Sequence, residues 1–432
     1  MSKEHFRNGP TRYELFVTVS LMGIICYFVY ALLAGADAFD WLCMNNSGGF
    51  VFGDYFQHLL FMQDAKHVYV NVQGVWGSFP PLIYIFYNFL FHLTHRGGEM
   101  YSDYYYLMNA EYVLLVFLFY SILITLGFLY AVKSWKKQSH YRMMFLCLIF
   151  SVPFFTGSYE RGNCCMVVLI LLLIALNWRE SESKIKRELA LVLIAASAGI
   201  KLYPAIFGLL YLKEKRWKEA VRLVIYGILL FFIPFLFFLG KDGFILWLSN
   251  ILETFKVDCV GRVEFIKGVY CTCSYYLIGN VNETIGTSVA IFFLLVLLFL
   301  AFISNSLSRS VFFLCAIMTL LPSNAFRYTI CYLSIPLIID LMEHGNEKVT
   351  KPFPVLETVI YGLVFTIPTY WGVVTQFRLN FNDEYSRMTY VEVWVYGMAY
   401  LLLGIIIVHE LIDVLKNNNY NSELKKLIKT KV

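Results

Sequence analysis

The run GTSVAIFFLLVLLFLAFIS, residues 286–304, decides the fold class of this chain. It contains no charged residue, and about 20 residues of apolar helix suffice to cross the hydrocarbon core of a bilayer. Apolar segments resembling it recur at residues 13–34, 107–132, 143–157, 164–178, 189–212, 220–239, 310–321, 328–341, 356–376 and 391–415. We therefore predict an all-α polytopic membrane protein that forms one integral membrane domain over residues 1–432.

The composition supports this prediction. Of the 432 residues, 59% are apolar and 15% are charged, whereas a soluble domain has roughly 45–50% apolar and about 25% charged residues. The mean hydropathy is +0.63. These values exclude a soluble enzyme and an ordinary nucleic-acid-binding protein, and they make membrane lipids the surrounding solvent of the chain.

Two segments do not fit a simple crossing. The segment 189–212 contains GIKLYP at its centre, where Gly199 and Pro204 disfavour a continuous helix and Lys201 is costly at the bilayer centre. We predict that it forms a hairpin of two short helices. The shorter apolar segment 80–93 is predicted to be a re-entrant or interfacial helix. Together these choices give about 12 transmembrane helices.

The basic residues set the orientation. With this topology, 24 of the 35 Lys and Arg residues fall on one side, and cytoplasmic loops carry the excess of such residues. We predict that both termini are cytoplasmic. The loops 35–106, 240–285 and 377–390 then lie on the outer face.

The outer loops contain most of the polar residues. A helix over residues 55–70 is predicted to lie in the membrane interface, and 244–255 has a similar pattern. Four cysteines also fall outside the membrane, where an oxidising compartment would allow disulfides whose pairing the spacing does not define: Cys43, Cys259, Cys271 and Cys273.

Four short motifs carry a resemblance to a known family. They are GDYFQH at 53–58, ERGN at 160–163, GIKLYP at 199–204 and LPSNAFRY at 321–328. The first resembles the first-loop signature of glycosyltransferase family 87, the polyprenol-phosphate-mannose-dependent mannosyltransferase-like members of the GT-C superfamily. The others resemble later landmarks of that family, and the similarity covers roughly residues 50 to 220 plus 321–328.

The resemblance implies a GT-C-like fold, a polyprenyl-phosphate sugar as donor, and a carboxylate of the first outer loop as base. No cofactor is required, and a divalent metal is not indicated. The chain departs from the family at one position, because Arg327 stands before Tyr328 where the family commonly has His. Any catalytic role of that His therefore does not transfer to this chain.

Asp54 is the predicted catalytic base. It follows Gly53, which allows close approach of a substrate, and glycosyl transfer needs a group that accepts the proton of the acceptor hydroxyl. The alternative is a solvated loop acid or a helix N-cap. Asp37 and Asp40 are rival bases that more often act as caps. His58, one helical turn after Asp54, is predicted to hydrogen-bond Asp54 or the donor phosphate.

Three cations are candidates for binding the donor phosphate: Lys201, Arg161 and Arg327. Lys201 is the strongest, because a cation within a membrane segment is costly without a function; the alternative is that it reaches the outer headgroups. Arg161 follows Glu160, with which it could instead form an ion pair. Tyr203 and Tyr328, in the same motifs, complete the predicted substrate-binding residues.

The function predicted from these residues is an inverting hexosyltransferase. It would move a sugar, with a mannose-like hexose favoured, from a polyprenyl-phosphate donor to a lipid-linked or glycan acceptor on the outer face of a bacterial inner membrane. The alternative is a polysaccharide polymerase or a lipid-linked oligosaccharide flippase. An ion-coupled transporter is disfavoured, because the predicted spans contain almost no acids.

Overall fold

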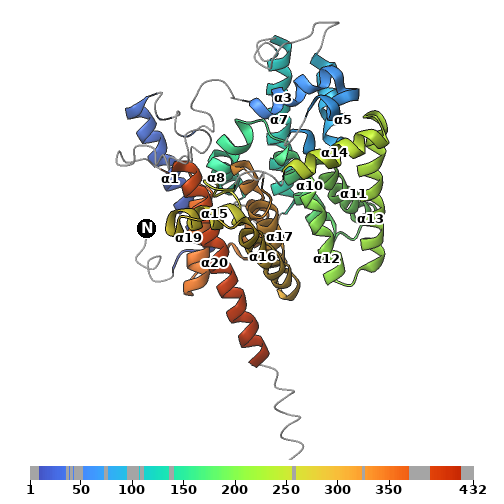
Figure 1. The fold of residues 1–432 in the computed structure, drawn as a ribbon. Coiled ribbons are helices and arrows are strands. Elements are labelled where there is room, and N and C mark those ends of the chain that lie inside the picture. The colour runs from blue at the N-terminus through green and yellow to red at the C-terminus, as the bar shows by residue number, and fades with distance from the viewer. Residues whose placement is uncertain are drawn as a thin grey trace, which may run out of the picture.

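The computed structural model describes residues 9–35, 38, 42, 52–72, 76–94, 107, 111–135, 141–254, 259–323, 326–368 and 390–419. These residues form helices without a β-strand, apart from one isolated bridge between Thr11 and Lys348 (Figure 1). The α-helices are α1 (Arg12–Ala34), α3 (Gly53–Phe61), α4 (Val68–Asn71), α5 (Pro81–Thr94), α7 (Glu111–Ser134), α8 (Tyr141–Phe150), α9 (Val152–Phe154), α10 (Cys165–Trp178), α11 (Lys184–Ile200), α12 (Gly208–Lys213), α13 (Trp217–Phe232), α14 (Lys241–Thr254), α15 (Ile266–Ile278), α16 (Glu283–Ile303), α17 (Leu307–Leu320), α18 (Ser334–His344), α19 (Pro352–Val364) and α20 (Tyr390–Asn419). Short segments of 3-10 or π helix connect some of them: η2 (Met62–His67), η3 (Trp76–Ser78), η4 (Phe155–Tyr159), η5 (Tyr203–Phe207), η6 (Ile233–Phe237) and η7 (Arg327–Leu333).

Among the described residues, five helices are long and apolar enough to cross a membrane: 12–34, 112–134, 217–237, 283–303 and 391–416. The pair 141–150 and 152–159, bent by 61°, brings the number to six if it forms one span. The prediction of an all-helical membrane protein is thus confirmed among the described residues. The predicted count of about 12 transmembrane helices is not, because α5, α10, α17 and α19 are apolar but shorter than a full crossing.

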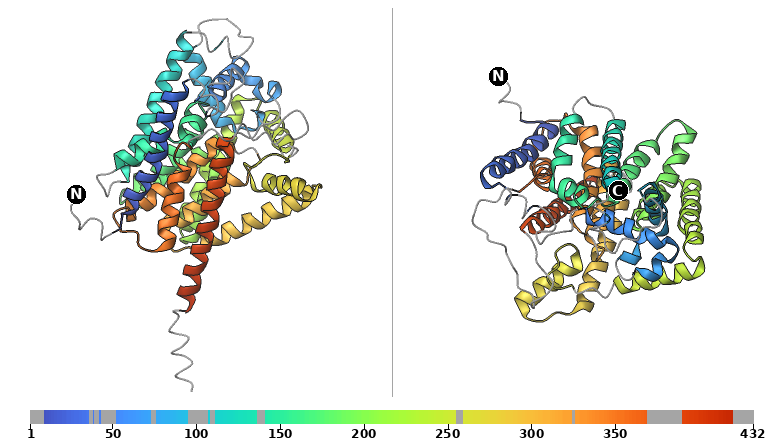
Figure 2. Two further views of the ribbon diagram at one scale, coloured as in Figure 1. Left: turned by 90° about the vertical axis from the view of Figure 1, so that its left-hand side faces the viewer. Right: turned by 90° about the horizontal axis from the view of Figure 1, so that it is seen from above.

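The short apolar helices are more deeply buried than the long ones. Almost every residue of α17 is buried, and α10 is buried on most of its surface. By contrast, α7 and α13 leave most of their apolar side chains exposed. Figure 2 shows α20, in red, running along the bundle and extending beyond it. The short helices therefore form the core that supports the site.

The predicted hairpin in segment 189–212 is present. Helix α11 ends at Ile200, and the chain returns through η5 and α12 to Lys213. Arg179, before α11, forms an ion pair with Glu214, after α12, and Arg216 pairs with Glu180 at 2.9 Å. Both ends of the segment therefore lie together, and Lys201 lies at the opposite end, at the break.

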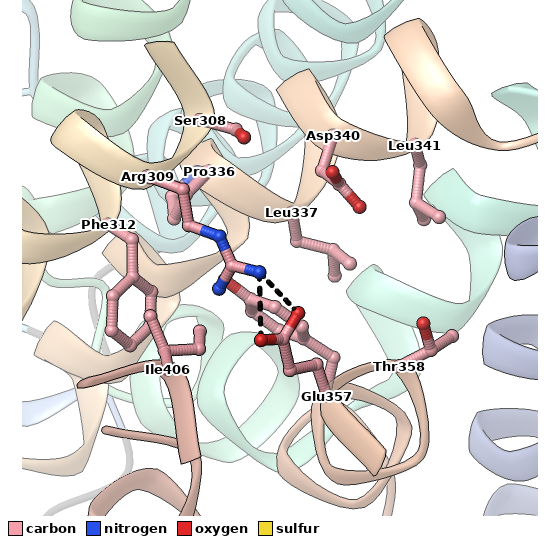
Figure 3. A pocket seen from close by; sticks show the side chains of 11 residues that line it. Ser308, Arg309, Phe312, Pro336, Leu337, Asp340, Leu341, Glu357, Thr358 and Ile406 are labelled. Carbon is pink, nitrogen blue, oxygen red and sulfur yellow. Dashed lines mark hydrogen bonds and ion pairs between the residues drawn. The ribbon is translucent and has the colours of Figure 1, made fainter. Parts of the chain in front are cut away.

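The loops predicted to be cytoplasmic gather at one end of the molecule. Lys213 Nζ donates to the Ala301 carbonyl at 3.0 Å, and Arg12 donates to Asp340 at 2.7 Å. Arg309 binds both carboxylate oxygens of Glu357 at 2.8 and 2.7 Å, beside a small cavity (Figure 3). The distribution of Lys and Arg residues predicts that these loops lie on the same side of the membrane, and their position at one end of the molecule agrees with that prediction.

The first outer loop departs from its predicted helix. Residues 55–70 are divided among α3, η2 and α4, because Asp64 has non-helical angles of φ −129° and ψ 62°. The predicted helix at 244–255 corresponds to α14 up to Thr254, and residue 255 lies outside the described residues. Trp247 Nε1 of α14 donates to the Ser78 carbonyl at 3.0 Å. Helix α14 therefore packs onto the first loop.

Reporter tags inserted after Glu182 and after Lys215 should report the same side of the membrane. The ion pairs of Arg179 with Glu214 and of Arg216 with Glu180 hold these loops together. A tag after Asn280, at the other end of the long helix α16, should report the opposite side. Opposite sides for the first two tags would contradict the hairpin.

Candidate active site

The site is built on an irregular turn before α10. In η4 the Glu160 N–H donates to the Phe155 carbonyl at 3.0 Å, and the Asn163 N–H donates to the Ser158 carbonyl at 3.1 Å. Both bonds span five residues, the spacing of a π-helix, and such turns occur frequently at functional sites. The turn presents Glu160, Arg161 and Asn163, from the ERGN motif, toward the first outer loop.

Helix α3 docks directly onto this turn. The Phe52 N–H donates to the Glu160 carbonyl at 2.6 Å, and the Tyr55 N–H donates to the Arg161 carbonyl at 3.2 Å. Gly162 has a φ of +62°, and a Cβ there would lie 2.6 Å from Tyr55 Cβ, so glycine permits the approach. Phe52 adopts a left-handed φ of 60°, which is costly for a bulky residue.

Asp54 is held by both residues that flank Gly162. Arg161 Nε donates to Asp54 Oδ1 at 3.1 Å, and a second Arg161 nitrogen donates to the same oxygen. Asn163 Nδ2 donates to Asp54 Oδ2 at 2.6 Å. Asp54 is only 4% exposed, and the N-cap of α3 is Phe52. Asp54 is therefore neither a solvated acid nor a cap.

Asn163 is a site residue that sequence reasoning missed. Its Oδ1 accepts the Cys165 N–H at 3.0 Å, which fixes the amide orientation and directs Nδ2 at Asp54. The ERGN motif contained this residue, but its local sequence gave no sign that it would contact a residue 109 positions earlier.

Arg327 pairs with Glu160 across the site. Their side chains approach to 3.6 Å, and Arg327 is 1% exposed. Arg161 forms an ion pair with Asp54, and Glu160 lies within ion-pair distance of Arg327. The pairing of Arg161 with its neighbour Glu160 stays a prediction.

Lys201 has a different environment. Its Nζ lies 5.2 Å from the ring centre of Phe79, 5.7 Å from that of Tyr203 and 5.0 Å from that of Tyr328. We name these three rings the aromatic cage. Lys201 is only 7% exposed, and a cation this buried usually has a carboxylate partner. Among the described residues, however, no carboxylate forms an ion pair with Lys201. The cage partly compensates the cation through cation–π attraction. The five described charged side chains of the motifs, Asp54, Glu160, Arg161, Lys201 and Arg327, together carry one net positive charge.

His58 packs among aromatic rings beside the cage. It stacks on Tyr87 with ring centres 4.7 Å apart and meets Phe79 edge-on at 4.7 Å. Burial lowers the pKa of His58 to about 4; the Asp54 carboxylate opposes this shift and Lys201 adds to it. The imidazole is therefore neutral at pH 7, and His58 supplies no cation for phosphate. Its role as a hydrogen-bond partner stays a prediction.

All seven predicted site residues lie within one region. Asp54 and His58 come from α3, Arg161 from the turn after η4, Lys201 and Tyr203 from the break after α11, and Arg327 and Tyr328 from η7. Gly157 allows η7 to pack on η4, because a Cβ there would lie 3.1 Å from Tyr328 Cα. The rival bases Asp37 and Asp40 lie outside the described residues.

Two further sets of residues are the cysteines outside the membrane and the side chains that could bind a metal ion. Cys259, Cys271 and Cys273 form no disulfide with a described residue, and Cys43 lies outside the described residues. In the part of the chain that the structure describes, no three His, Cys, Asp or Glu side chains are grouped as metal ligands would be.

Comparison with known proteins identifies the family. The model of glycosyltransferase family 87 matches residues 104–324, just over half of the chain. The chain therefore belongs to glycosyltransferase family 87, and it is a glycosyltransferase with membrane-spanning helices. The matched range contains Arg161 and Lys201, whereas Asp54 precedes it and Arg327 follows it. No curated protein and no solved structure matches the chain.

Proposed function

We propose that this protein is an inverting hexosyltransferase that uses a polyprenyl-phosphate sugar as donor. The observation that carries the proposal is the pairing of a caged cation with a buried carboxylate in one site. Lys201 is the cation without a carboxylate partner among the described residues, and Asp54 is the carboxylate oriented by Arg161 and Asn163. A membrane-embedded transferase that acts on a lipid phosphate needs both groups.

The charges support a phosphate diester as the bound group. Among the described charged side chains of the four motifs, Arg161 pairs with Asp54 and Arg327 with Glu160, so Lys201 contributes the net positive charge of this set. A phosphodiester donor carries one negative charge and neutralises it. The donor phosphate would thus act as the counter-ion of the buried Lys201 ammonium. Such an ion pair is favourable where water is excluded, because the attraction between the two charges is stronger there.

The proposed reaction is a single displacement. Asp54 accepts the proton of the acceptor hydroxyl, and the hydroxyl oxygen attacks the anomeric carbon of the sugar. The bond between that carbon and the phosphate oxygen breaks, its electron pair stays on the phosphate, and polyprenyl phosphate leaves. Lys201 stabilises the charge that grows on the leaving phosphate. The configuration at the anomeric carbon is inverted, and the reaction as proposed requires no cofactor.

The finer assignments follow from the family resemblance and the charge pattern. We propose a mannose-like hexose as the sugar, and a lipid-linked or glycan acceptor. The site would face outward from a bacterial inner membrane with both termini cytoplasmic, because the loops rich in Lys and Arg gather at the opposite end from Lys201.

A donor panel tests the proposal. The full chain, purified in detergent, is incubated with radiolabelled polyprenyl-phosphate monosaccharides and lipid-linked acceptors. One donor, with mannose favoured, should release polyprenyl phosphate and transfer its label. Release from none of the donors would overturn the proposal and favour the alternative of a polysaccharide polymerase or flippase, which binds a lipid pyrophosphate without Asp54 chemistry.

A further inference from the structure

An open hollow of about 630 Å³ lies at the end of helix α7, and its lining residues lie outside the four motifs of the candidate active site. It is formed where α7, α10 and α11 meet, and we name it the α7 hollow. Its lining consists of Tyr130, Lys133, Ser134, Asn177, Trp178, Glu180, Ser181 and Lys186. The catalytic cluster uses none of these residues.

The α7 hollow has an excess of positive charge. Lys133 and Lys186 both line it, and neither has an ion pair with another described residue. The carboxylate of Glu180, also in the lining, is already engaged by Arg179 at 3.1 Å and Arg216 at 2.9 Å. Two lysines, from α7 and α11, therefore line one space without an ion-pair partner among the described residues, which favours an anionic ligand.

Hydrogen bonds connect the helices that line the α7 hollow. Asn177 Nδ2 donates to the Ser134 carbonyl at 3.0 Å, and Trp135 Nε1 donates to the Leu173 carbonyl at 3.1 Å. These bonds join the end of α7 to α10. The two helices thus hold the hollow in shape before any ligand arrives, which lowers the entropic cost of binding.

An apolar stripe leads from the α7 hollow along the membrane. Phe119, Leu123, Leu126 and Tyr130 are each more than half exposed, and their spacing places them on one face of α7 together with Lys133. With a rise of 1.5 Å per residue, the stripe spans about 17 Å. One leaflet of the hydrocarbon core is about 15 Å deep, so the stripe matches an acyl chain in length.

We infer that the α7 hollow binds an anionic phospholipid, with its phosphate between Lys133 and Lys186 and an acyl chain along the stripe. Aromatic side chains at the mouth, from Tyr130 and Trp178, are typical of the membrane interface. A free phosphate would satisfy the lysines but would make no use of the stripe. The stripe therefore favours a lipid over a soluble anion.

The test measures lipid binding by the purified full chain. Native mass spectrometry in detergent counts bound phosphatidylglycerol and phosphatidylcholine, with inorganic phosphate as a competitor. The parent should bind phosphatidylglycerol in preference to phosphatidylcholine. Lys133→Gln with Lys186→Gln should weaken phosphatidylglycerol binding roughly 30-fold, since each basic residue near a lipid surface contributes about fivefold.

Two controls make the outcome specific. Lys184→Gln with Lys218→Gln removes two exposed lysines outside the α7 hollow and should leave binding unchanged. Lys201→Met should also leave it unchanged, so that binding at the α7 hollow is separated from any binding at the catalytic site. Equal binding by the parent and the Lys133/Lys186 variant, or equal competition by millimolar inorganic phosphate, would overturn the inference.

Discussion

Asp54→Asn should lower turnover by a factor of about 10² to 10⁴, the usual contribution of a general base. The substitution keeps the size of the side chain but removes the basic oxygen that would accept the acceptor proton. It also leaves Arg161 as a buried cation without its carboxylate, so thermal stability should fall as well. The measurement is sugar transfer with the active donor, beside a thermal unfolding curve.

A second variant separates chemistry from stability. Asp54→Asn combined with Arg161→Gln removes both charges, so thermal stability should return toward that of the parent while turnover stays lost. Asp64→Asn is the matched control, because this acid lies in the same loop but its side chain is half exposed; its turnover should match the parent. If Asp54→Asn kept more than about a tenth of turnover, or if the double variant regained turnover, Asp54 would not be the base.

Lys201→Met should raise the donor KM roughly 10- to 150-fold, because a hydrogen bond to a charged group contributes about 1.5–3 kcal/mol. Thermal stability without donor should rise rather than fall. The buried ammonium has no carboxylate partner among the described residues, and Met fills the aromatic cage without the cost of burying a charge. Higher thermal stability together with lower donor affinity is expected when a residue is present for ligand binding at a cost to the stability of the fold.

Lys213 provides a matched control for Lys201. It is also a partly buried lysine in an apolar segment, but its Nζ donates to oxygens of Ala301, Ser304 and Ser310. Lys213→Met should therefore lose stability and leave the donor KM unchanged, whereas Lys201→Arg should retain much of the affinity. An unchanged donor KM in Lys201→Met would refute its role as the phosphate ligand.

Much of the fold could be predicted because membrane helices are encoded locally. The charge-free run at 286–304 corresponds to α16, and the break at Lys201 followed from a Gly, a Lys and a Pro within one apolar segment. The number of crossings could not be predicted in the same way. Helices such as α17 are apolar because protein surrounds them, and composition does not distinguish a helix buried in protein from one that spans the lipid.

The site was predictable as a set of residues but not as a set of contacts. Lys201 stands out because a cation in an apolar segment is costly, and Arg161 and Arg327 belong to motifs. Their partners depend on packing between distant segments, so the pairing of Arg161 with Asp54 could not be read from the sequence. Phe79, a wall of the aromatic cage, carries no polar group that would have marked it.

The π-turn η4 has an evolutionary consequence. Relative to an α-helix, such a turn accommodates one additional residue, and one residue corresponds to a rotation of about 100° around the helix axis. Deleting one residue from this turn would therefore rotate Arg161 and Asn163 relative to Asp54 on α3. A one-codon deletion here is thus expected to disrupt the candidate site even where the surrounding helices keep their length, so the length of this turn is under tighter selection than its individual apolar residues.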